Sequence, residues 1–239
     1  MVNIQLNNNL QSRLVFIGTE QLPVLVIEQL IAQPEQLLDL ACANHLGQQA
    51  YQQQLTDYYP GLRKAAPSAY IAQLSQLLPL LKSSFARPQA TQARVVMSAF
   101  SIATTPPEQL RPIQMLPHFD SPAVNQFAVV HYLCDPAHGG TAFYRHKSSG
   151  FECITADRLA IYRKQIKQQA IAEKLHLQPK YMTGDSPLFS RLHSVPAKMN
   201  RAVIYPSNAL HSGDIKPEMG LLSEPRKGRL TMSSFIRLE

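Results

Sequence analysis

Residues 127–144 have the sequence FAVVHYLCDPAHGGTAFY, and this stretch decides the expected fold. Its first part, 127–133, is rich in β-branched and aromatic side chains, which favour a strand. Gly139 and Gly140 predict a turn, and the segment 141–144 that follows has strand-forming composition again. The stretch therefore predicts two strands on either side of a glycine turn.

The segments around this stretch extend the pattern in both directions. Strand-forming composition recurs in 23–31, 93–105, 201–205 and 229–236. Apolar side chains at helical spacing predict helices over 34–45, 68–85 and 157–174, and Pro79 is expected to kink the second of these. Helices thus cluster in the first 90 residues and strands dominate afterwards, which favours a β sandwich or barrel with outer helices over alternating βα units.

Composition limits the class of protein. Of the 239 residues, 45% are hydrophobic, enough to bury a sizeable core and too many for general disorder. No apolar run reaches the roughly 18 residues of a membrane span, and the start lacks the basic and apolar regions of a secretory signal. The three cysteines, Cys42, Cys134 and Cys153, form no CxxC pair, so we expect a cytoplasmic protein without disulfides or a four-cysteine zinc site.

The net charge of +7 is unevenly spread, because sixteen basic and only eight acidic residues lie between Tyr144 and Glu239. A basic surface attracts nucleic acid, acidic proteins or small acids. The chain has no Lys/Arg-rich block and no basic stretch interleaved with aromatic residues. We therefore favour a solvated basic surface and predict neither nucleic-acid nor membrane binding.

The candidate chemistry begins at His118-Phe119-Asp120. On an extended backbone, residues i and i+2 point to the same face, so His118 and Asp120 can present an imidazole nitrogen and a carboxylate oxygen together. Such a pair alone is more often an ordinary surface pair. A third ligand is available at His211, just after the strand predicted over 201–205. Two histidines and one carboxylate occupy one face of an octahedral iron and leave positions open for a 2-oxo acid and O2.

Four motifs in this order resemble the Fe(II)/2-oxoglutarate-dependent dioxygenases, and within them the prolyl-4-hydroxylase-like branch. The motifs are His118-Phe119-Asp120, GGTAF at 139–143, HSG at 211–213 and GRLT at 228–231. The clear resemblance covers about 115–239. It implies a double-stranded β-helix, or jelly roll, as a catalytic core over 91–239. The segment 1–90 would be an N-terminal helical support region of the same single domain, 1–239.

The resemblance also implies roles for six residues. His118, Asp120 and His211 would bind Fe(II). Arg229 would pair with the far carboxylate of 2-oxoglutarate, because a guanidinium fork suits a carboxylate. Thr231 would add a hydrogen bond, and Tyr132 would contact the same carboxylate; the alternative for Tyr132 is a core tyrosine of its strand.

One position departs from the resembled family. Relatives often carry a tyrosine on the strand before the two metal ligands. That strand here offers Ser98, Phe100 and Ser101 instead. The contacts to the metal-binding end of 2-oxoglutarate are therefore left unassigned.

The resemblance implies an oxidoreductase that couples oxidation of 2-oxoglutarate by O2, giving succinate and CO2, to hydroxylation of a C–H bond. Halogenating relatives lack the carboxylate ligand, so Asp120 favours hydroxylation. One alternative is a nucleic-acid demethylase, but those relatives carry a second arginine six residues after the first, where this chain has Phe235. Another is a non-catalytic metal-binding jelly roll. The substrate, whether a free amino acid, a peptide, a protein side chain or a small metabolite, is left open, and a homodimer is compatible with the sequence.

Overall fold

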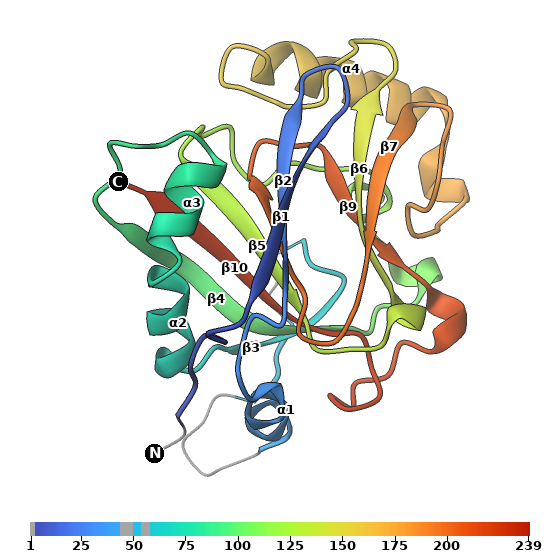
Figure 1. The fold of residues 1–239 in the computed structure, drawn as a ribbon. Helices are drawn as coiled ribbons and strands as arrows, with labels where there is room; N and C mark the ends of the chain where they lie inside the picture. The colour runs from blue at the N-terminus through green and yellow to red at the C-terminus, as the bar shows by residue number, and fades with distance from the viewer. Residues whose placement is uncertain (1–2, 44–49, 54–57) are drawn as a thin grey trace.

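The computed structural model describes residues 3–43, 50–53 and 58–239, and it is mainly β (Figure 1). In that part of the chain, two antiparallel sheets and four α-helices form the regular structure. The prediction of a mainly β protein with flanking helices is therefore confirmed.

The larger sheet has seven strands in the order β1–β2–β8–β5–β10–β4–β3. These strands are β1 (Gln11–Ile17), β2 (Leu22–Glu28), β8 (Ala202–Pro206), β5 (Gln126–Tyr132), β10 (Leu230–Leu238), β4 (Ala93–Ala103) and β3 (Gly61–Ala65). The smaller sheet has the order β7–β6–β9, with β7 (Phe189–Pro196), β6 (Gly139–His146) and β9 (His211–Ile215). The prediction of a turn at Gly139 and Gly140 was wrong, because both residues pair in the ladder as the first two residues of β6. The successive strands β5 and β6 belong to different sheets.

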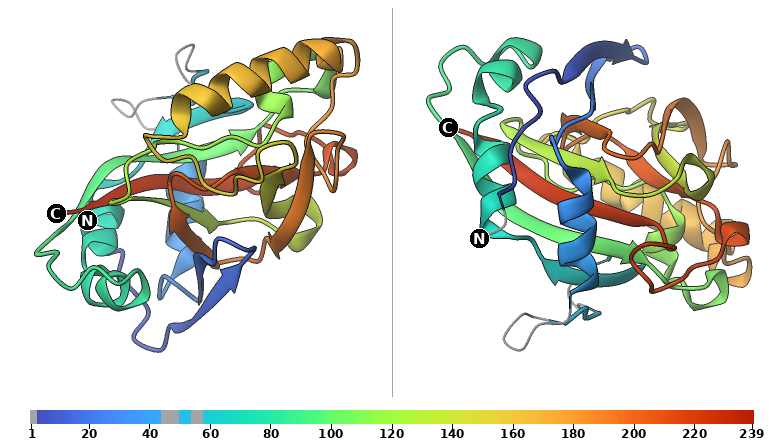
Figure 2. Two further views of the ribbon diagram at one scale, coloured as in Figure 1. Left: turned by 90° about the horizontal axis from the view of Figure 1, so that it is seen from above. Right: turned by 60° about the horizontal axis from the view of Figure 1, so that its bottom comes forward.

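Three helices cover the outer face of the larger sheet, and a fourth lies at the other end of the molecule (Figures 1 and 2). They are α1 (Pro34–Cys42), α2 (Ser68–Ser75), α3 (Leu78–Ser84) and α4 (Leu159–Ala172). Leu37, Leu74 and Leu81 of the first three helices pack in one core with Phe100 and Phe127 of the sheet. α4 packs instead against the smaller sheet, where Tyr162 joins a cluster with Tyr144 and Phe189.

Alternation along β10 separates the two faces of the larger sheet. Leu230, Met232 and Ile236 belong to the outer core beneath the helices. Thr231 lies between the first two of these along the strand, so its side chain points to the inner face, towards the smaller sheet. The two sheets pack together on this inner side, where the ring centroids of Phe143 and Tyr205 are 4.9 Å apart.

The N-terminal region contains more strand than the sequence patterns predicted. β1, β2 and β3 all lie within the first 90 residues and pair into the same sheet as the later strands, so this region is a helical support only in part. The strands β1, β3, β7 and β9 were not expected. Whether such short segments form strands depends on pairing with strands that are distant in sequence, and the local pattern of residue types does not predict that pairing.

The prediction of one kinked helix over 68–85 was wrong in detail. The chain forms two helices, α2 and α3, and Pro79 lies in the first turn of the second. A proline lacks the N–H that a continuing helix would need, but it is well tolerated in a first turn. The end of the helix predicted over 34–45 lies partly outside the described residues. Among the described residues, none of the helices is both long and apolar enough to cross a membrane.

Candidate metal centre

Backbone hydrogen bonds bring the three predicted metal ligands together. The segment around His118 runs antiparallel to the start of β9, and His118 and His211 exchange two N–H···O bonds of 2.8 Å. The Asp120 N–H donates to the Ser207 carbonyl at 2.8 Å, in the turn between β8 and β9. Residues 93 positions apart along the chain therefore lie on neighbouring extended segments.

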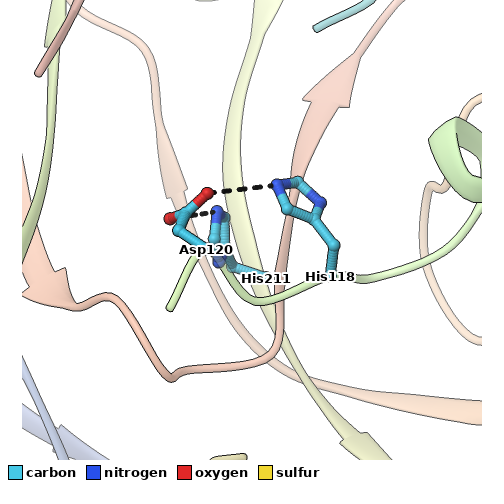
Figure 3. A group of neighbouring side chains, drawn as sticks. All are labelled: His118, Asp120 and His211. Carbon is cyan, nitrogen blue, oxygen red and sulfur yellow. Dashed lines mark ion pairs between the residues drawn. The ribbon is translucent and has the colours of Figure 1, made fainter. Parts of the chain in front are cut away.

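The three side chains converge on one point (Figure 3). One candidate ligand atom from each residue lies within 4.8 Å of the others. His118 Nε2 is 3.8 Å from Asp120 Oδ1, and His211 Nε2 is 3.6 Å from Asp120 Oδ2. A divalent ion holds such ligands at about 2.1 Å, so two ligands of one ion lie about 3–4 Å apart. The spacing therefore fits a shared metal ion.

The environment of His211 fixes its tautomer and its charge. Its Nδ1 lies 3.0 Å from the Ala209 carbonyl, which can only accept, so Nδ1 carries the proton and Nε2 keeps its lone pair. Burial lowers the pKa of His211 to about 4, against a weaker opposing effect of the bond to Ala209. The imidazole is therefore neutral near pH 7, as a metal ligand must be.

The triad is open to solvent on one side. The His118 side chain is 45% exposed, whereas that of Asp120 is 17% exposed and that of His211 only 7%. Phe119, between the first two ligands, points away and packs edge-on against Tyr162 of α4, with ring centroids 6.1 Å apart. The alternation expected at His118-Phe119-Asp120 is therefore present. Molecules can reach the triad from the His118 side.

Arg229, immediately before β10, is buried, with only 4% of its surface exposed. Its side chain therefore does not point outward to solvent. Its Nη2 donates to the Gly140 carbonyl at 2.8 Å, and the guanidinium carbon is 5.9 Å from the centroid of the Tyr132 ring. The Nε of Arg229 is buried and has no hydrogen-bond partner among the described residues. A fixed cation thus lies inside the protein with part of its hydrogen-bonding capacity unused.

Tyr132 and Thr231 lie directly opposite each other on the paired strands β5 and β10. The Tyr132 hydroxyl is 2.6 Å from Thr141 Oγ1, and Thr231 Oγ1 donates to the Ser101 carbonyl at 3.3 Å. Burial raises the pKa of Tyr132 to about 12, and the guanidinium of Arg229 opposes this shift. The structure therefore places all three residues predicted to contact 2-oxoglutarate in one buried polar group.

Three residues near this group were given no role at the sequence level. Tyr205 of β8 lies on the inner face, and its ring centroid is 4.7 Å from that of His211. Ser101 lies opposite Thr231 on β4, and its Oγ is buried without a hydrogen-bond partner among the described residues. Burial raises the pKa of Tyr59, and the Arg229 guanidinium opposes this shift, so Tyr59 also lies near the cation. Alternation in the strand over 201–205 could have placed Tyr205 on the inner face; nothing local distinguishes Tyr59.

In the part of the chain that the structure describes, His118, Asp120 and His211 form the one group of three or more potential ligands close enough to share a metal ion. Cys134 and His138 join no such cluster there. All three cysteines are free thiols.

A family model described as "Family of unknown function (DUF6445)" matches residues 8–236. The chain belongs to this family. No curated protein matches it. Among solved structures, the crystal structure of AviO1 from Streptomyces viridochromogenes Tue57 is similar with a TM-score of 0.44 and 12% sequence identity, over 88% of this chain and 86% of that chain. At that level the likeness carries no argument about activity, which must come from the site itself.

Proposed function

We propose that this protein is an Fe(II)- and 2-oxoglutarate-dependent oxygenase that hydroxylates a C–H bond of its substrate inside a jelly-roll core. The observation that carries the proposal is the combination of a solvent-open His-Asp-His triad with a buried, incompletely bonded arginine on the same inner side of the molecule. Two antiparallel sheets that pack face to face support the jelly-roll assignment.

The donor set suits iron. Two imidazoles and one carboxylate, contributed by His118, Asp120 and His211, form the facial arrangement typical of non-haem Fe(II) oxygenases that leave coordination positions open. A closed structural zinc site would instead supply four protein ligands. The exposure of His118 agrees with a centre that must admit O2 and a substrate.

The buried polar group around Arg229 suits a dicarboxylic acid. A buried cation is costly unless an anion or strong hydrogen bonds compensate it. Arg229 Nε and Ser101 Oγ have no hydrogen-bond partner within the described part of the chain and lie on the inner side, with Tyr132 and Thr231 beside them. The far carboxylate of 2-oxoglutarate would supply the missing acceptor for Arg229 and accept from these hydroxyl groups.

The protein's own residues would bind and orient the ligands, and they would exclude water from the site. His211 is held in one tautomer by Ala209, and Arg229 is fixed by its bond to Gly140, so both contacts are organised before any ligand arrives. Phe143 and Tyr205 form an apolar wall beside His211. When bound, iron and 2-oxoglutarate supply the O2-dependent oxidation. In the overall reaction, one oxygen atom enters succinate, the other enters the new hydroxyl group, and CO2 is released.

The experiment is a substrate screen coupled to 2-oxoglutarate turnover. Purified protein with Fe(II), ascorbate and 2-oxoglutarate is incubated with free amino acids, peptides and small metabolites, and succinate is quantified. Substrate-dependent succinate formation that is lost in His211→Ala supports the proposal.

Binding distinguishes an enzyme without its substrate from a protein of another kind. Titration of 2-oxoglutarate into the Mn(II)-loaded protein without O2 needs no substrate. Metal binding without any 2-oxoglutarate binding would reject the oxygenase and favour the non-catalytic metal protein. The demethylase alternative gains no support, since position 235 holds a half-buried phenylalanine.

A further inference from the structure

The helix α4 is exposed along most of its length, although it lies beside the candidate metal centre. Of its 14 residues, only Tyr162 is buried. Tyr162 packs edge-on against Phe119, the residue between the predicted ligands His118 and Asp120. Leu116 and Phe119 also pack against the apolar cluster beneath the helix. The segment that carries two of the three predicted ligands is therefore in contact with α4.

The exposed side of α4 carries positive charge only. Arg163, Lys164 and Lys167 are exposed, the helix contains no acidic residue, and none of these three cations forms an ion pair within the described part of the chain. Lys174, which follows the helix, is exposed as well. Like charges three or four residues apart repel each other on a helix, as Lys167 does with Lys164 and Arg163. The cluster is therefore unfavourable in the free protein, and an anionic partner would relieve the repulsion.

Apolar side chains lie among these cations. Ile161 is 55% exposed and Ile171 is 65% exposed. Ile171 follows Lys167 by four residues and precedes Lys174 by three, so both cations flank it on the helix surface. The isoleucines are separated by cations and form no continuous apolar stripe of the kind with which a helix lies in a membrane surface. A phosphate backbone would use the positive charges alone. Charge and apolar contact together suit a peptide.

We propose that the exposed side of α4 docks an acidic segment of a peptide or protein substrate, in which carboxylates flank an apolar side chain. The proposal rests on the proposed function and narrows its substrate to a peptide or a protein side chain. A helix of 14 residues is about 21 Å long, so a free amino acid would leave most of this surface unused. His118 is the most exposed of the three predicted ligands and lies next to Phe119. A segment bound on α4 is therefore beside the open side of the triad.

The test measures binding directly and needs no turnover. The probe is a dye-labelled peptide of Glu and Leu residues, and its control peptide has Gln in place of every Glu. Both are titrated into the Mn(II)-loaded protein at low ionic strength, because salt screens the attraction between exposed charges, and fluorescence anisotropy is measured. The parent should bind the Glu peptide about tenfold more tightly than the Gln peptide. Lys164→Glu/Lys167→Glu should abolish this preference and keep parent-like affinities for Mn(II) and 2-oxoglutarate.

The matched control is Lys82→Glu/Lys216→Glu, which changes the net charge by the same amount. Lys82 belongs to α3 on the outer side of the larger sheet, and Lys216 follows the end of β9 that is away from His211. The control variant should keep the preference for the Glu peptide. All four substituted lysines lie at the surface or half-buried, and circular dichroism checks that both variants are folded.

The outcomes separate this proposal from the proposed function. A parent without preference for the Glu peptide, or an equal loss of preference in both variants, would overturn the docking surface. Tighter binding to phosphatidylserine vesicles or single-stranded DNA than to the Glu peptide, lost in Lys164→Glu/Lys167→Glu, would also overturn it and assign the surface to that partner. A parent that binds the Glu peptide through α4 but does not bind 2-oxoglutarate would reject the proposed function, and the docking surface would stand.

Discussion

His131 and Tyr132 are neighbours on β5, both are fully buried, and their side chains point to opposite faces of the same sheet. The His131 ring is completely bonded, with Nδ1 3.2 Å from the Tyr70 hydroxyl and Nε2 3.1 Å from Asn200 Oδ1. Tyr132 lies instead beside Arg229, whose Nε has no hydrogen-bond partner in the part of the chain that the structure describes. Burial of a polar residue therefore does not by itself indicate a ligand site; the two residues differ in whether a neighbouring group lacks a hydrogen-bond partner among the described residues.

The two faces differ in the same way beyond this pair. On the outer face, Asn200 also bonds both backbone groups of Ile31, so the His131 cluster ties α2, the sheet and the chain after β2 together. It needs nothing further and is a structural cluster. On the inner face, Arg229 and Ser101 each keep a buried side-chain atom without a hydrogen-bond partner among the described residues. The contrast between the two faces can be tested by changing one residue of each.

The largest effect is expected at Arg229. Arg229→Ala should weaken 2-oxoglutarate binding by on the order of thirty-fold or more, since removing one partner of a buried charge pair costs about 2–5 kcal/mol. Arg229→Lys keeps the charge without the planar fork and should lose only part of the affinity. Calorimetry with the Mn(II)-loaded protein in the absence of O2 measures both, and metal binding should survive.

Arg237 is the control for Arg229. It lies at the other end of β10 and donates to Gln126 at 3.1 Å. Arg237→Ala should leave the affinity unchanged. Parent-like 2-oxoglutarate binding by a folded, metal-loaded Arg229→Ala protein would remove the central support for the oxygenase.

Much of this inner group could be predicted from the sequence, because its residues lie in motifs with fixed spacing. His118 and Asp120 share a face through simple alternation, and Arg229 and Thr231 do so at the start of β10. Tyr205 has no such motif; its position beside His211 depends on β8 lying beside β5. The outer cluster could not be predicted either, since His131, Tyr70 and Asn200 come from three distant segments and meet only through packing.

The second effect concerns pH and the outer face. Burial lowers the pKa of His131 from 6.5 to about 4, although the hydrogen bond to Asn200 opposes this. The unfolded chain therefore binds a proton on this imidazole more tightly than the folded chain does. The contribution of His131 to the free energy of unfolding is fully present above pH 6.5 and is lost as the pH falls towards 4. The loss should reach about 3 kcal/mol for this one residue.

Urea denaturation of the metal-free protein between pH 7 and 4.5 measures this loss. His131→Gln should be less stable at pH 7. Its free energy of unfolding should also depend less steeply on pH, because up to one proton fewer is taken up on unfolding. His211, which is buried with a similarly lowered pKa, contributes equally in both proteins. An identical pH slope in parent and variant would show that His131 does not titrate as a buried neutral group.

The third effect returns to the inner side. A metal that binds only the folded protein should stabilise it by about 2.7 kcal/mol at a hundredfold excess over the dissociation constant, which is about 5–10 °C in Tm. His211→Ala should lose this shift. His176→Ala removes an exposed histidine outside the triad and should keep it. Differential scanning fluorimetry with Mn(II) is the measurement, and an equal shift in parent and His211→Ala would reject the third ligand.

The smallest effects are expected for two serines on adjacent strands of the same sheet. Replacing each with alanine should change the stability of the protein in different directions. Ser234 of β10 lies opposite Ser98 of β4, and their hydroxyls are 2.8 Å apart on the outer face. Ser234→Ala removes a buried hydrogen bond and should cost about 1 kcal/mol of stability.

Ser101 faces inward, and its buried hydroxyl has no partner among the described residues. Ser101→Ala removes an unsatisfied group and should leave the ligand-free protein equally or more stable, but it should weaken 2-oxoglutarate binding severalfold. Urea denaturation measures the stability of both variants, and titration measures their affinity for 2-oxoglutarate. If Ser101→Ala destabilises the protein as much as Ser234→Ala and leaves the affinity intact, the inner hydroxyl is structural, and the distinction between a satisfied outer face and a ligand-ready inner face fails at that position.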